Sequence, residues 1–126
     1  MLYKRNEYFR YTFEEPFEAT FRLKKEASET SPEEISKKGK CLMIDISPNG
    51  VKMYSELFIA IDQLNHVELQ FKIDETPIQI DGEFIWSHRK KVGFEYGVRL
   101  MGDEESEKLI ISELKNRRKK ELELKK

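Results

Sequence analysis

Apolar and polar side chains alternate along several short stretches of the chain, which is the pattern of β-strands with one buried face. In residues 17–23 every odd-numbered position is apolar and every even-numbered one is polar or charged. The same alternation recurs in residues 66–73, 78–86 and 94–101. Two apolar runs, residues 41–46 and 51–55, flank a turn with a proline and an Asn-Gly pair, and so predict a hairpin. The sequence therefore predicts about six antiparallel strands.

The segments outside these strands are mostly polar. Residues 24–40 predict a solvated loop, with one helical turn at residues 32–35, because they contain a proline, a glycine and few apolar residues. After Gly102 the sequence lacks glycine and proline, begins with acidic residues and ends with basic ones, which favours a helix. Its apolar stripe ends at Leu114, so we expect the first half to pack on the sheet and the second half to project into water. Strands at hairpin spacing followed by one helix predict a mainly β fold, a closed or nearly closed barrel with a C-terminal helix.

Composition and charge narrow the range of functions. The 126 residues suffice for one domain, and 23 basic against 24 acidic residues give a formal net charge of −1. A chain-wide positive field for nucleic acid or an anionic membrane is therefore excluded, and an anion site must be a local cluster. One cysteine and two distant histidines do not form a metal cage. Without a long apolar segment or signal peptide, we expect a cytoplasmic protein with no metal and no membrane insertion.

The residue patterns that usually indicate catalysis are missing from the sequence. The acidic residues are spread through the expected strands and helix, and Ser47 has no histidine at a spacing that suggests a pair. Cys41 lies in an apolar strand, where a small buried hydrophobic residue is expected. There is no glycine-rich phosphate loop. We therefore expect a binding protein rather than an enzyme, with no cofactor.

A basic segment at the N-terminus is the first candidate for chemistry. Residues 4–10, KRNEYFR, place Lys4, Arg5 and Arg10 among aromatic residues. The planar guanidinium of arginine can bind a phosphate or the O6/N7 edge of guanine through two hydrogen bonds, and it can stack on a base. The alternative is a basic arm that binds no ligand.

The second candidate is DISPNG, residues 45–50, at the predicted hairpin turn. An ionised Asp45 can accept hydrogen bonds from guanine N1–H and N2–H or from backbone amides. Ser47 can bind a phosphate or cap the turn, and Gly50 allows an unusual backbone angle or a close approach. The alternative is a serine turn that closes the hairpin without a ligand.

Together the two segments resemble the PilZ domain family, the bacterial receptors for cyclic di-GMP. The family carries an RxxxR motif, usually within RRxxxR, in an arm ahead of the first strand, and (D/N)xSxxG at a hairpin. Asp45, Ser47 and Gly50 match the second motif. Arg10 matches the closing arginine of the first motif and Arg5 the arginine that often precedes it, whereas Asn6 stands where the opening arginine belongs. The segments GEFIW and YGVRL resemble the late strands of the family, so the resemblance covers nearly the whole chain.

The resemblance implies a six-stranded antiparallel PilZ-type barrel with a C-terminal α-helix. Residues 1–16 would form a flexible arm, residues 17–102 the barrel and residues 103–126 the helix, all in one domain. The ligand would be cyclic di-GMP, alone or as an intercalated dimer, and the site would consist of Arg5, Asn6, Arg10, Asp45, Ser47 and Gly50. Binding would order the arm and signal to an effector protein that controls motility, biofilm or exopolysaccharide. We expect a monomer or weak dimer that binds no DNA or RNA.

Two other functions stay open at this stage. A degenerate PilZ module could act as an adaptor that binds protein partners without nucleotide, as the uncharged Asn6 suggests. A small barrel that binds nucleic acid is the third possibility, because residues 116–126 are largely basic, although no row of aromatic residues forms a stacking platform. Trp86 is expected to cap one end of the core rather than to stack on a guanine, and is not among the expected site residues.

Overall fold

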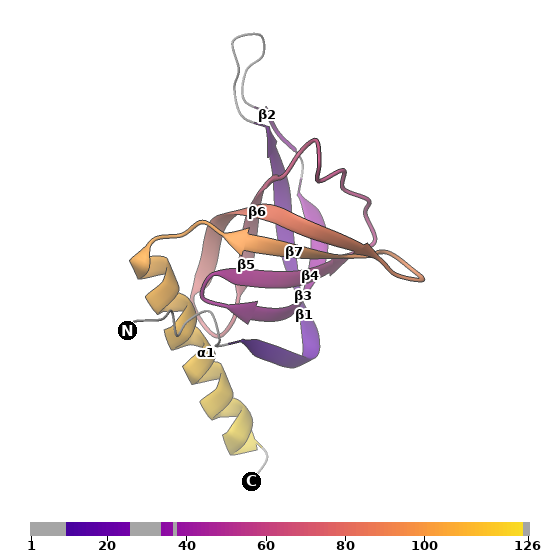
Figure 1. Cartoon of the computed structure of the whole chain (residues 1–126). Helices are drawn as coiled ribbons and strands as arrows, with labels where there is room; N and C mark the ends of the chain where they lie inside the picture. Colours follow the sequence, from indigo (N-terminus) through magenta and orange to yellow (C-terminus); the bar gives the residue numbers. More distant parts are fainter. Residues whose placement is uncertain (1–9, 26–33, 37, 125–126) are drawn as a thin grey trace, which may run out of the picture.

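The computed structural model describes residues 10–25, 34–36 and 38–124. Within them the chain folds into strands and one helix (Figure 1), whose bounds are β1 Tyr11–Lys25, β2 Glu34–Ile35, β3 Gly39–Ser47, β4 Gly50–Ser55, β5 His66–Lys72, β6 Pro77–Arg89, β7 Phe94–Leu100 and α1 Glu104–Leu124. The six long strands correspond to the six alternating or apolar stretches of the sequence, and the helix to the segment after Gly102.

The six long strands form a closed antiparallel barrel. The sheet order is β2-β1-β3-β4-β7-β6-β5, and an additional pairing between β1 and β5 closes it. Strand β1 can pair with both β3 and β5 because it is 15 residues long. Its first part, from Tyr11, pairs with β3, and its last part, Thr20 to Lys24, pairs with β5. The predicted barrel with a C-terminal helix is therefore confirmed.

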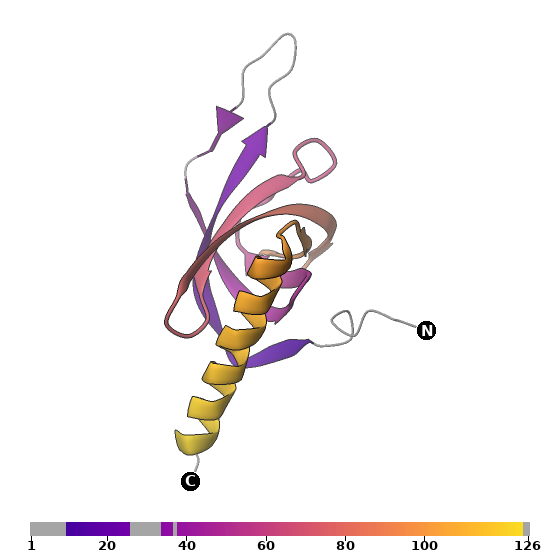
Figure 2. The same cartoon turned by 90° about the vertical axis from the view of Figure 1, so that its left-hand side faces the viewer.

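The barrel interior and one helix face make up the hydrophobic core. Inward-facing residues of the long strands, such as Met43, Met53 and Leu69, are fully buried. Helix α1 lies along one side of the barrel and extends beyond it in both views (Figures 1 and 2). It adds Ile110 and Leu114 to the core. The helix begins after Asp103, whose carboxylate accepts a hydrogen bond from the Ser106 amide at 2.9 Å, so Asp103 is its N-cap.

Two expected boundaries differ from the structure. Strand β1 begins at Tyr11 rather than at Phe17, so residues 11–16, which we expected in the arm, belong to the strand. The register with β3 shifts between Thr12 and Phe17, and Pro16 lies in this irregular segment, where its missing N–H interrupts no regular ladder. The predicted helical turn at residues 32–35 is wrong for residues 34–35, the part that the structure describes. These two residues form β2 and pair with β1.

Part of the second half of α1, which we expected to project into water, contacts the barrel before the helix extends beyond it (Figures 1 and 2). The Arg117 guanidinium lies 4.7 Å from the Phe13 ring centroid and 5.0 Å from that of Phe17, and donates to the Ile73 carbonyl at 3.2 Å. The Lys120 ammonium forms an ion pair with Asp74 at 2.9 Å. These contacts use charged side chains, so an apolar stripe could not reveal them. Within the described residues, no helix combines the length and the apolar character needed to cross a membrane.

Candidate nucleotide-binding site

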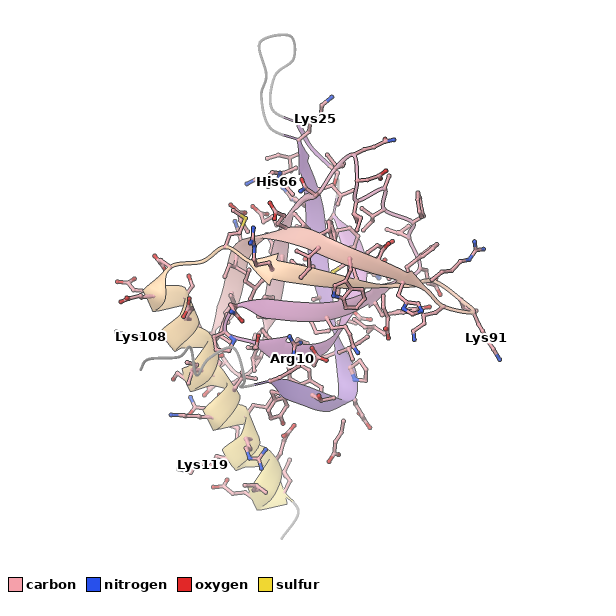
Figure 3. The ribbon with its side chains drawn as sticks, in the orientation of Figure 1. Arg10, Lys25, His66, Lys91, Lys108 and Lys119 are labelled. Atoms are coloured by element: carbon pink, nitrogen blue, oxygen red, sulfur yellow. The ribbon has the colours of Figure 1, made fainter. Side chains whose placement is uncertain are left out.

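The two sequence motifs meet at the start of β1. The Arg10 guanidinium forms a hydrogen-bonded ion pair with the Asp45 carboxylate, although the two residues are 35 positions apart. The pairing follows from strand register, because Thr12 of β1 lies opposite Asp45 of β3. Figure 3 shows Arg10, the first described residue, beside the barrel strands. About half of the Arg10 side chain is exposed, whereas that of Asp45 is 9% exposed.

This ion pair lies at the edge of a hollow on the outer face of the barrel. The hollow has a volume of about 480 Å³, which is within the usual range of ligand sites. It is formed by the end of the arm, the β3–β4 hairpin and strands β6 and β7, and is lined by Arg10, Asp45, Asn49, Gly50, Val51, Lys52, Ile85, Trp86, Gly97, Val98 and Arg99.

The lining of the hollow carries more positive than negative charge. Arg10, Lys52 and Arg99 supply three cations, and Asp45 is the only carboxylate among the described lining residues. This excess contrasts with the net charge of −1 for the whole chain. A concave surface with clustered cations attracts anions and strengthens their binding. The hollow is therefore a local cluster of cations of the kind that an anion site requires.

Gly50 keeps part of the hollow open. Its φ is outside the left-handed region, since Gly93 is the only described residue with positive φ. A Cβ at Gly50 would lie at ordinary contact distances, 3.5 Å from Ser47 Oγ and 3.7 Å from an Arg10 nitrogen. The expected unusual backbone angle is therefore wrong, and the fold tolerates a side chain here. A side chain at position 50 would occupy space beside Arg10, where a ligand can approach.

Ser47 lies inside the turn and does not line the hollow. It is 1% exposed, and its hydroxyl is 3.1 Å from Asn49 Oδ1 and 3.4 Å from the Gly50 carbonyl oxygen. These contacts are those of the turn-capping role, one of the two that the sequence left open for Ser47. The hydroxyl holds the turn that presents Asp45 and Gly50 to the hollow.

Trp86 lies on the barrel surface. We expected it at one end of the core. A bulge between Phe84 and Trp86 changes the register with β7, so that Trp86 faces outward opposite Gly97 and is 39% exposed. A Cβ at Gly97 would overlap the indole ring, so this glycine allows the ring to lie across β7. The expectation that Trp86 caps the core is corrected, and the ring forms part of the wall of the hollow.

The structure brings together Arg10, Asp45 and Gly50 around the hollow and places Ser47 beneath them, while Arg5 and Asn6 lie outside the described residues. Neither sequence motif includes Lys52 or Arg99, and Trp86 was not among the expected site residues. The sequence does contain a signal for the two cations. Lys52 lies two residues after Gly50, and Arg99 lies two residues before Met101. Each is at an outward-facing position of a strand whose side chains alternate between the two faces. No cluster of metal-ligating side chains occurs in the described part of the chain.

The residue after Arg10 connects this region to the helix. The Tyr11 hydroxyl forms a hydrogen bond with the Glu121 carboxylate of α1. Burial, together with this bond and the negative charge of Glu121, raises the pKa of Tyr11 to about 12. The tyrosine therefore remains a neutral donor to Glu121 at neutral pH.

Comparisons with known proteins agree with this fold. The family model described as "PilZ domain" matches residues 4–116. Among solved structures, the PilZ domain of YcgR from Escherichia coli, solved with c-di-GMP, superposes with a TM-score of 0.60 and 14% sequence identity. The match covers 93% of this chain and 97% of the YcgR chain. A search of curated proteins gave no significant match.

Proposed function

Because the chain belongs to the PilZ domain family, we propose that it is a receptor for cyclic di-GMP and binds this nucleotide in the hollow beside Arg10 and Asp45. The observation that carries the proposal is the convergence of Arg10, the last residue of the N-terminal basic segment, and the DxSxxG hairpin on one cation-rich hollow. The YcgR domain with a similar fold was solved with c-di-GMP, which supports the same ligand class.

The chemistry of the ligand suits the lining of the hollow. Cyclic di-GMP has two phosphates, which attract Arg10 and the other cations, and two guanines with donor and acceptor edges. The Asp45 carboxylate can accept from guanine N1–H and N2–H, while the Trp86 ring offers an aromatic surface for stacking. We include Arg5 and Asn6 as ligand contacts on the match to the family motif. Ser47 and Gly50 act by shaping the turn and leaving space.

The signal in this proposal is the ordering of the arm. The ligand would hold residues 4–10 against the barrel, and an effector protein would recognise the resulting surface. As with other members of the family, the process controlled would be motility, biofilm or exopolysaccharide production in the cytoplasm. In this proposal the protein is a receptor that passes the signal to the effector protein and catalyses no reaction.

The test is titration with cyclic di-GMP, followed by calorimetry and by fluorescence of Trp86, the only tryptophan in the chain. We expect binding of one or two nucleotides per chain, a change in Trp86 emission, and no competition by GTP. Arg10→Ala and Asp45→Asn should weaken binding by about tenfold or more, because each removes a charged hydrogen-bond partner. Arg89→Ala is the matched control, since Arg89 is exposed on β6 outside the hollow.

The alternative function is an adaptor that binds protein without nucleotide. One observation favours it: Arg10 and Asp45 already neutralise each other in the absence of ligand. If wild-type protein shows neither heat nor a Trp86 response at high micromolar nucleotide, the receptor proposal is wrong and the adaptor function replaces it. Binding that is unchanged in both Arg10→Ala and Asp45→Asn would show that the nucleotide binds elsewhere.

A further inference from the structure

Lys52 is a barrel residue that neither sequence motif includes, and it lines the hollow. It lies on β4 directly opposite Asp45 of β3, at the point where the register between these strands shifts. Its ammonium nitrogen is 3.9 Å from Asp45 Oδ2, and its side chain is 34% exposed. On its other side lies Gly97 of β7, over which the Trp86 ring lies.

The three cations of the hollow differ in how firmly they are held. Arg99 donates to the Glu83 carboxylate at 2.8 Å, and Arg10 is hydrogen-bonded to Asp45 Oδ1. Lys52 is 3.9 Å from Asp45 Oδ2, which is an ion pair but too long for a hydrogen bond. It forms no other ion pair with a described residue. Lys52 is therefore the cation of the hollow that is most available to a ligand.

A guanine that binds Asp45 would release Lys52 from the one ion-pair partner it has among the described residues. Asp45 has two carboxylate oxygens, and both face cations in the free protein. When guanine N–H groups take up these oxygens, the lysine ammonium needs another anion, because a charge that loses its partner at a partly buried site is unfavourable. A phosphate suits the ammonium, which is a compact point charge with three donors on a flexible chain.

We infer that Lys52 contacts a phosphate of the bound cyclic dinucleotide and thus contributes a cation from the barrel itself. This inference rests on the proposed function. The arm has the uncharged Asn6 where the family motif has an arginine, so one positive charge is missing from the usual set. Lys52 is positioned to supply a charge to the same ligand from β4.

The experiment compares three variants by calorimetric titration with cyclic di-GMP. Lys52→Met removes the charge but keeps much of the side-chain length, and Lys52→Arg keeps the charge. Lys40→Met is the matched control, because Lys40 is an exposed lysine of β3 that does not line this hollow. We expect Lys52→Met to weaken binding about tenfold or more, and Lys52→Arg and Lys40→Met to stay within about threefold of wild type. The affinity of Lys52→Met should also depend less on salt concentration.

The outcomes separate this inference from the proposed function. No binding by the wild-type protein would overturn both. Wild-type binding that Lys52→Met leaves unchanged would overturn only the role of Lys52. An equal loss in Lys52→Met and Lys40→Met would show general attraction by surface charge rather than contact, and would also overturn it. Thermal unfolding of each variant identifies a folding defect, and Lys52→Gln then replaces Lys52→Met.

Discussion

Asp45 is the residue on which the local electrostatics of the hollow depend. It is 6% exposed, yet its two oxygens face the Arg10 guanidinium and the Lys52 ammonium. A buried carboxylate is stable only with such partners. In the free protein the three groups partly neutralise one another. A nucleotide must exchange these internal partners for its own donors and phosphates, so the affinity reflects a difference between two sets of ionic contacts.

The first prediction concerns the charge that the arm lacks. We expect Asn6→Arg to strengthen binding of cyclic di-GMP by about tenfold or more, since a hydrogen bond to a charged group contributes roughly 1.5–3 kcal/mol. The measurement is the Kd from calorimetry at fixed ionic strength. Glu7→Gln, which changes the net charge of the arm by the same +1 at the next position, is the control. Equal gains in both variants would show that only the overall charge of the arm matters.

The second prediction concerns the buried Cys41. Burial raises the pKa of its thiol from 9.0 to about 12, so the folded protein keeps this proton at pH values where the unfolded chain has lost it. The corresponding stability is fully present below pH 9 and is lost as pH rises from 9 to 12. Between pH 8 and pH 10, urea denaturation should show the free energy of unfolding falling about 1 kcal/mol more in wild type than in Cys41→Ala. Parallel pH profiles for the two proteins would contradict this.

At the scale of elements, the alternation of side chains was sufficient to predict the long strands. Each strand of the barrel has one face in the core, so its sequence carries the period of two. The same rule failed where the backbone departs from regular pairing. The irregular start of β1 around Pro16 concealed six residues of strand, and the bulge before Trp86 reversed the face on which that ring lies. Bulges depend on the neighbouring strand, which a single stretch of sequence does not show.

The candidate site was predictable only in part for a related reason. The two motifs identified Arg10, Asp45 and Gly50 because each has a recognisable residue spacing. Lys52 and Trp86 come from different strands, and they meet only because both flank Gly97 of β7 in the closed barrel. Their contribution depends on the order of the strands in the barrel. Only the resemblance to a family allowed us to expect that order.

The third prediction concerns the contact between α1 and the β5–β6 turn. The carboxylate of Glu113, 4% exposed, accepts hydrogen bonds from the backbone amides of Asp74, Glu75 and Thr76 at 2.9–3.2 Å. Glu113→Ala leaves three amides without this acceptor and should lower the free energy of unfolding by about 2–3 kcal/mol. Urea denaturation measures the change.

Two further variants define what this contact contributes. Glu113→Gln retains an acceptor oxygen but removes the charge. Its free energy of unfolding should therefore fall by less, about 1 kcal/mol. Glu105→Ala, at an exposed position of the same helix, should stay within about 0.5 kcal/mol of wild type. If Glu113→Ala is no more destabilised than Glu105→Ala, the turn does not depend on the helix.

At the scale of the whole molecule, β1 joins the regions on which the proposed signal depends. Its two ends close the barrel by pairing with β3 and β5. Arg10, just before it, contacts the hollow, while Tyr11 and Phe13 contact Glu121 and Arg117 of the helix. A ligand that holds Arg10 therefore acts on a strand that is already attached to α1. We therefore expect the helix to respond when a ligand binds in the hollow.

The last prediction follows from this connection and is measured by amide hydrogen exchange. With saturating cyclic di-GMP, exchange should slow in residues 4–13 and in the hairpin around residues 45–52, because the ligand contacts both. It should also slow in residues 117–124 of α1, which contact β1 but not the hollow. Tyr11→Phe, which removes the hydrogen bond to Glu121, should retain protection at the hairpin and reduce it in the helix. Equal slowing throughout the chain would indicate only global stabilisation, and protection confined to the arm and hairpin would show that β1 does not transmit binding to the helix.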